Sequence, residues 1–327
     1  MVERVGYRCR YAYARSADSR LADDVGQDYL VLRITDPQLA LVLCDGVSQS
    51  FVGDLAARVL ADALLNWLDT TVNGSSTTVI ESLTERLTAL AAEAQPAIDG
   101  FSLPVDLPPM LREVLEQKRT LGSESTFIAI LIDTTMERLL VAWMGDSRVR
   151  LWGTQTERTS ELGETFHTAE RWSSRRGPVG TPHVALMSLA DVTRLLIYSD
   201  GLAQLDQRGD IPLSDAELDA LITDAGNAPT SDDVSLVEVW LTQPTPQPPD
   251  DQAEIPAAAQ QTDTADLSRQ SLVDSPTAPV TQIAPVTTLD ASAEANTLGA
   301  LATVAKCWAP IIIVTGLVII GIILLRR

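Results

Sequence analysis

Residues 39–46 read LALVLCDG, residues 138–146 read RLLVAWMGD and residues 194–201 read RLLIYSDG. Each segment is an apolar run of strand length, rich in Val, Ile and Leu, that leads into an aspartate. A strand end is held by its sheet, so a side chain mounted there keeps a fixed position. We therefore expect Asp45, Asp146 and Asp200 to be presented from the ends of three strands.

Further apolar runs surround these three along the chain. Strand character recurs in YLVLRI at 29–34, STFIAILID at 125–133 and VSLVEVW at 234–240. Helical periodicity occurs at 53–71, 79–94 and 111–118. One stripe of the helix expected at 53–71 is apolar and comprises Leu55, Val59, Leu60, Ala63, Leu64 and Trp67. Strands bracket helices instead of alternating with them, which favours an α+β sandwich over a doubly wound parallel sheet.

Carboxylates gathered from strand ends suit hard divalent cations. Oxygen ligands favour Mg²⁺ or Mn²⁺, and a chain with only 2 histidines makes a zinc site improbable. A single Asp-Gly pair is more often a turn than a ligand. Three such aspartates in order on strand ends favour a metal site.

Composition excludes other classes of function. The formal net charge of -20 would repel a phosphate backbone, so nucleic acid is not an expected partner. Cys9, Cys44 and Cys307 form neither a C-x-x-C pair nor a disulfide framework. A reducing, cytoplasmic setting fits best.

The last quarter of the chain changes character. Residues 244–305 are rich in Pro, Ala, Thr, Gln, Asp and Ser and lack periodicity, which predicts a disordered linker after a domain at 1–243. Residues 308–325 read WAPIIIVTGLVIIGIILL without a charge, so residues 306–327 are expected to form a C-terminal transmembrane anchor. No secretory signal precedes the domain, and we expect it in the cytoplasm beside the membrane.

Six motifs, taken in order, give the domain a family resemblance. They are GQDY at 26–29, LVLCDGVSQSFVGDLAA at 41–57, GSESTFIAILI at 122–132, WMGDSRVRLW at 143–152, MSLADVTRLLIYSDGL at 187–202 and SDDVSLVEVW at 231–240. Together they resemble the metal-dependent, PPM-type (type-2C) serine/threonine protein phosphatases, especially compact bacterial members. The match covers roughly residues 6–241.

The resemblance implies a sandwich of two antiparallel sheets flanked by helices, with two Mn²⁺ or Mg²⁺ ions and a possible third in a cleft at one edge. In it Asp45 bridges both ions, with the carbonyl of Gly46 completing one shell. Asp200 and Asp232 hold one metal. The other is reached through water by Asp28, and the third is supported by Asp146. Paired cations would lower the pKa of a shared water, which attacks phosphorus in line.

Some positions depart from the family pattern. Gln27 stands where relatives have Glu, which we expect to weaken metal affinity more than to abolish catalysis. Relatives carry a phosphate-binding arginine five residues before the aspartate that Asp28 matches, and here that position is Asp23. Arg20 is the candidate replacement, the alternative being a solvated surface arginine. His183, in the place of the family's flap, is expected to be an ordinary loop histidine rather than an acid.

The sequence thus predicts hydrolysis of phosphoserine or phosphothreonine in protein substrates, opposing a Ser/Thr kinase at the membrane. The main alternative is a catalytically silent, phosphatase-like module that binds a signalling partner. A metal-free structural domain is the third possibility. Retention of all five aspartates favours the enzyme.

Overall fold

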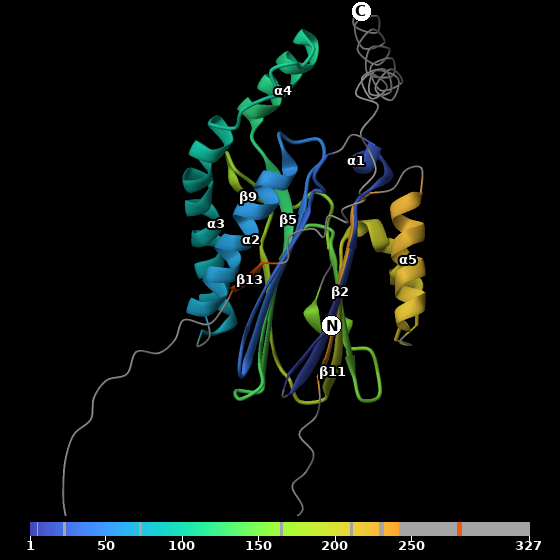
Figure 1. The fold of residues 1–327 in the computed structure, drawn as a ribbon. Coiled ribbons are helices and arrows are strands. Elements are labelled where there is room, and N and C mark those ends of the chain that lie inside the picture. Colours follow the sequence, from blue (N-terminus) through green and yellow to red (C-terminus); the bar gives the residue numbers. More distant parts are fainter. Residues whose placement is uncertain are drawn as a thin grey trace, which may run out of the picture.

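A computed structural model describes residues 1–4, 6–21, 24–71, 74–163, 166–209, 212–228, 232–241 and 280–282. Within them, two antiparallel sheets pack face to face and helices cover both outer faces (Figure 1). The predicted α+β sandwich of two antiparallel sheets flanked by helices is confirmed. Apart from residues 280–282, the expected linker and the expected anchor at 306–327 lie outside the described residues. None of the described helices is both long and apolar enough to cross a bilayer.

The smaller sheet has the strand order β1-β2-β12-β11-β7. Its members are β1 (Val2–Arg4), β2 (Tyr7–Ala14), β12 (Val234–Leu241), β11 (Val192–Tyr198) and β7 (Arg148–Gly153). The predicted strands at 194–198 and 234–240 therefore lie side by side. β2 was not predicted, because arginine and tyrosine interrupt its apolar pattern.

The larger sheet has the order β10-β6-β5-β4-β3-β13, and β8 and β9 extend it from β5. Its members are β3 (Asp28–Thr35), β4 (Gln38–Gly46), β5 (Glu124–Asp133), β6 (Arg138–Met144), β8 (Arg171–Ser173), β9 (Gly177–Val179), β10 (His183–Ser188) and β13 (Val280–Gln282). The four runs predicted to be strands in this sheet are confirmed as β3 to β6.

Both faces of the larger sheet are buried, which explains its continuous apolar runs. One face of β4 presents Leu39, Leu41 and Leu43 to the core between the sheets, and the other presents Val42 and Cys44 to the helices. Trp143, on β6, is buried between the sheets. Each strand end is consequently fixed from two sides.

The described residues form five α-helices. They are α1 (Ala17–Leu21), α2 (Gly53–Thr70), α3 (Ser76–Asp99), α4 (Pro109–Leu121) and α5 (Asp215–Asn227), with 3-10 turns η1 (Thr159–Leu162) and η2 (Asp200–Gln207). α2 and α3 cover the larger sheet, whereas α5 covers the smaller (Figure 1). The predicted stripe on α2 is partly wrong: Leu55 and Val59 are only half-buried, because Ala57 and Ala61 face the sheet instead.

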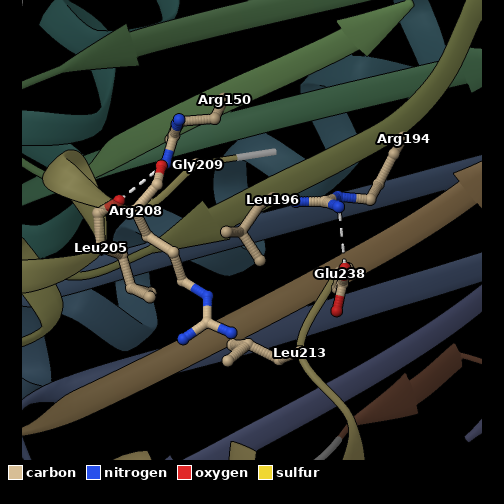
Figure 2. Close-up of a pocket in the computed structure, with 8 residues that line it drawn as sticks. All are labelled: Arg150, Arg194, Leu196, Leu205, Arg208, Gly209, Leu213 and Glu238. Atoms are coloured by element: carbon tan, nitrogen blue, oxygen red, sulfur yellow. Dashed lines mark hydrogen bonds and ion pairs between the residues drawn. The ribbon is translucent and has the colours of Figure 1, made fainter. Parts of the chain in front are cut away.

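A network of buried ion pairs stands on the outer face of the smaller sheet. Glu238, on β12, is 1 % exposed; it accepts hydrogen bonds from Arg10 at 2.6 and 2.9 Å and pairs with Arg194 at 3.3 Å. Arg150 beside them binds both carboxylate oxygens of Glu157. Figure 2 shows the small pocket that Arg150, Arg194 and Glu238 line together with residues of the η2–α5 connection. We call Arg10, Arg150, Arg194, Glu157 and Glu238 the arginine–glutamate network.

Candidate metal centre

Three aspartates from separate strands converge at one end of the sandwich. Asp45 lies at the end of β4, Asp146 in the turn between β6 and β7, and Asp200 just after β11. One carboxylate oxygen from each lies within 4.8 Å of the other two, and all three residues are half-buried. The expectation that these strand ends present their aspartates together is therefore confirmed.

The other two predicted aspartates border this trio. Asp28, the first residue of β3, is directly opposite Asp45 on the adjacent strand and is 5 % exposed. Asp232 precedes β12, and its side chain is exposed at the rim. The trio therefore has a buried carboxylate on one side and an exposed one on the other. We call these five aspartates the acidic centre.

The acidic centre is electrostatically strained without a cation. Burial, followed by the charges of Asp28 and Asp200, raises the pKa of Asp45 well above its usual range. Burial and the nearby charge of Asp233 raise the pKa of Asp28 to about 8. Burial and Asp232 also raise the pKa of Asp200. Each carboxylate thus disfavours the ionisation of its neighbours.

Close backbone packing explains two glycines of the acidic centre. A Cβ atom on Gly46 would lie 2.5 Å from the carbonyl carbon of Gly53, so glycine lets the start of α2 abut the end of β4. A Cβ atom on Gly201 would overlap the carbonyl oxygen of Asp233. These two glycines therefore allow close backbone contact between the end of β4 and the start of α2, and between the start of η2 and Asp233.

The donor set fits a divalent cation. Both carboxylate oxygens of Asp28 and one of Asp200 are buried without a hydrogen-bond partner in the described part of the chain. Among the described residues, no arginine, lysine or histidine forms an ion pair with any of the five aspartates. Oxygen-only ligands of this kind are those that Mg²⁺ and Mn²⁺ prefer.

An open depression adjoins the acidic centre. It lies between η2 and the end of α5, and is lined by Asp200, Gly201, Gln204, Asp224, Ala225, Ala228 and Asp232. A ligand in this depression would meet Asp200 and Asp232 first, so it is the approach to the centre that the structure offers.

Among the described residues, Arg20 hydrogen-bonds to Arg15 and to the end of α5 and makes no hydrogen bond to the five aspartates, so its phosphate-binding role stays a prediction. Its guanidinium donates to the carbonyl of Arg15 at 2.7 Å, to the carbonyl of Gly226 at 2.9 Å and to the side chain of Asn227 at 2.7 Å. These bonds join α1 to the C-terminal end of α5. Asp23 lies outside the described residues.

His183 belongs to a separate set of contacts. Its Nε2 lies 2.8 Å from Glu170, and its ring stacks on Trp143 with the centroids 5.2 Å apart. His183 is the first residue of β10, so the expectation that it lies in a loop is wrong, whereas the expectation that it is not an acid stays a prediction.

Asp233 lies next to the centre, and no role was predicted for it from the sequence. It is 3 % exposed, and its carboxylate accepts backbone hydrogen bonds from Ser16 and Gln27. Adjacent aspartates at 232 and 233 were the available signal. Only the fold shows that Asp232 points to the rim, whereas Asp233 is buried.

Comparison with protein families and with curated proteins found no match. Solved structures do match. A bacterial serine phosphatase is 14 % identical with a TM-score of 0.50, over 73 % of this chain and 99 % of that one. The serine/threonine phosphatase Stp1 from Staphylococcus aureus is 14 % identical with a TM-score of 0.50, over 72 % and 95 %. The chain thus shares the fold of bacterial serine/threonine phosphatases.

Proposed function

We propose that this protein hydrolyses phosphoserine and phosphothreonine in protein substrates with the aid of Mn²⁺ or Mg²⁺. One observation carries the proposal: the carboxylates of Asp45, Asp146 and Asp200 lie within 4.8 Å of one another without a cationic side chain paired to them in the described residues. Like charges so close need a counter-charge. The shared fold supports phosphate-ester chemistry as the use of that charge.

The residues take the following roles in the proposal. Asp45 would be the central ligand, with the carbonyl of Gly46 beside it, and Asp200 and Asp232 would hold one cation. Asp28 would act on a second cation through water. Asp146 would support a third, and its closeness to Asp45 and Asp200 supports its membership of the ligand set.

Divalent cations would supply a water of lowered pKa and would offset negative charge on the phosphoryl group. The chain's own contribution is to hold the carboxylates close together and fixed in position. Asp45 lies at the end of β4, Asp146 in the turn after β6 and Asp200 just after β11. Because these strands are buried on both faces, their ends resist displacement. The depression beside Asp200 and Asp232 leaves room for a phosphorylated side chain.

A phosphatase assay tests the proposal. Wild-type protein should release phosphate from p-nitrophenyl phosphate and from a phosphothreonine peptide only when Mn²⁺ or Mg²⁺ is present. Asp45→Asn and Asp200→Asn should lower that rate by more than about 100-fold, beyond the usual effect of a residue that only supports a ligand. Asp133→Asn, a buried aspartate at the other end of β5, is the control and should retain activity.

Equal background rates from wild type and both variants would contradict the enzyme. The remaining candidate would then be a silent, phosphatase-like module that binds a signalling partner.

We further propose that residues 306–327 anchor the domain to a membrane, where it opposes a Ser/Thr kinase from the cytoplasmic side. The support is the uncharged run at 308–325 after a polar linker. Deletion of residues 306–327 should move the protein from the membrane fraction to the soluble fraction. Retention in membranes after the deletion would contradict the anchor.

A further inference from the structure

We propose that Asp233 is a positioning residue that holds Asp28, Asp200 and Asp232 in register for cation binding. The inference rests on the proposed metal chemistry, and it assigns Asp233 no direct contact with substrate. The basis of the inference is that the buried side chain of Asp233 and the backbone of Asp233 together contact every segment that carries one of these three aspartates.

The side chain of Asp233 ties two loops together. One carboxylate oxygen accepts the backbone N–H of Ser16 at 2.6 Å, just before α1. The other accepts the backbone N–H of Gln27, the residue before Asp28. Because Gln27 is bonded directly to Asp28, the second hydrogen bond sets where β3 begins.

The backbone of Asp233 fixes the segment that carries Asp200. Its carbonyl oxygen packs against Gly201, where any Cβ atom would overlap it, and accepts the hydroxyl of Ser199 at 3.4 Å. The same hydroxyl accepts the backbone N–H of Ser235 at 2.9 Å. Residues on both sides of Asp200 are thereby held to the start of β12.

Asp232 is held by the same residue. The backbone N–H of Asp233 donates to one carboxylate oxygen of Asp232 at 2.9 Å. That bond restrains an exposed side chain that would otherwise sample several rotamers at the rim. Three of the proposed ligands therefore depend on the placement of Asp233.

Gly26 shows how tightly this arrangement is built. A Cβ atom at position 26 would overlap the hydroxyl of Tyr13 and would lie 3.0 Å from a carboxylate oxygen of Asp233. Glycine is thus needed for the chain to pass between β2 and Asp233. The close packing of the carboxylate of Asp233 against position 26 therefore depends on glycine there.

A carboxylate is needed at position 233 because both of its oxygens act as acceptors. Asparagine offers a single acceptor oxygen, and its amide group would face one of the two backbone N–H donors. A buried donor left without an acceptor is costly, so the loop carrying Ser16 or the loop carrying Gln27 would move. The expected result is looser placement of Asp28.

The test compares Asp233→Asn with Asp133→Ala. Asp133 is also buried, and it accepts the backbone N–H groups of Thr135 and Met136 at 3.0 and 2.9 Å, but at the far end of β5. Mn²⁺ affinity is measured by calorimetric titration, and stability by urea denaturation without metal. Asp233→Asn should weaken Mn²⁺ binding roughly 10- to 100-fold, as removal of a ligand-supporting group does. Asp133→Ala should destabilise the fold and leave Mn²⁺ affinity unchanged.

A second measurement needs no variant, so it tests the inference even if Asp233→Asn does not fold. In wild-type protein, Mn²⁺ should slow hydrogen exchange at the amides of Ser16 and Gln27 and leave exchange at Thr135 and Met136 unchanged. Wild-type Mn²⁺ affinity in a folded Asp233→Asn variant, or unchanged exchange at Ser16 and Gln27, would overturn the inference alone. Wild-type protein that binds no Mn²⁺ would overturn the proposed metal chemistry as well.

Discussion

The acidic centre and the arginine–glutamate network both bury charge, but they balance it differently. Glu238 is almost fully buried, and Arg10 and Arg194 pair with it from the same sheet. Asp28 and Asp45 are adjacent carboxylates that face further aspartates, with no cationic side chain among the described residues paired to them. One region is therefore neutralised within the fold, whereas the other lacks its counter-charge.

This difference separates a stabilising charge cluster from a functional one. A buried charge that has lost its partner costs several kcal/mol, so a fold keeps one only when something else compensates. In the arginine–glutamate network, Arg10 and Arg194 supply this compensation from within the chain. In the acidic centre it would have to come from bound cations, and the centre stands at the mouth of an open depression.

The largest expected effect on stability comes from removing Glu238 from the arginine–glutamate network. Glu238→Ala would remove the buried carboxylate that pairs with Arg10 and Arg194, leaving Arg10 only the exposed Asp215, and should lower the free energy of unfolding by about 3–5 kcal/mol. Urea denaturation measures this. Glu93→Ala, which removes the exposed pair with Arg86, is the control and should cost less than about 1 kcal/mol. Similar losses in the two variants would show that the network is not a buried, balanced unit.

The acidic centre should make stability without metal depend on pH in an unusual direction. Because the pKa of Asp28 in the fold is raised to about 8 from an ordinary value of 3.8, the folded state holds more protons than the unfolded state between these limits. The contribution of Asp28 to stability is therefore largest near the lower limit and falls as pH rises, by about 1 kcal/mol per pH unit.

Urea denaturation from pH 5 to pH 8, in the presence of a chelator, checks this slope. Saturating Mn²⁺ should flatten it, because the bound cation favours the ionised carboxylates. Stability that rises steadily with pH in the metal-free protein would contradict the account.

A smaller effect is expected at Arg20, which joins α1 to α5 instead of entering the acidic centre. Arg20→Ala should lower the free energy of unfolding by about 1 kcal/mol, the usual worth of such hydrogen bonds, and leave KM for a phosphopeptide nearly unchanged. A several-fold rise in KM with unchanged stability would instead support the phosphate-binding role predicted from the sequence.

The contrast between the two regions also shows what sequence patterns can reveal. Asp45, Asp146 and Asp200 were predictable because each follows an apolar run whose length and composition mark a strand. Asp233 was not, because its partners Ser16 and Gln27 lie more than 200 positions away along the chain. The helix α5 was also missed, although Ser214 and Glu217 form a capping box that marks its start.

The contacts of single arginines could likewise not be predicted from the sequence. Arg20 is the candidate replacement for the phosphate-binding arginine, but α5 offers it the carbonyl of Gly226 and the side-chain oxygen of Asn227 as acceptors, which no local pattern predicts. Local periodicity determines strands and their ends, whereas hydrogen bonds between distant loops depend on the assembled sandwich.

The most direct test of the central claim compares wild type with Asp45→Asn at pH 8 by urea denaturation, with and without Mn²⁺. If the acidic centre is built for cations, removing one carboxylate should stabilise the metal-free protein, because it relieves repulsion among buried charges. Added Mn²⁺ should then stabilise wild type strongly and the variant little. An Asp45→Asn variant that is less stable than wild type without metal, together with a wild type indifferent to Mn²⁺, would contradict the claim.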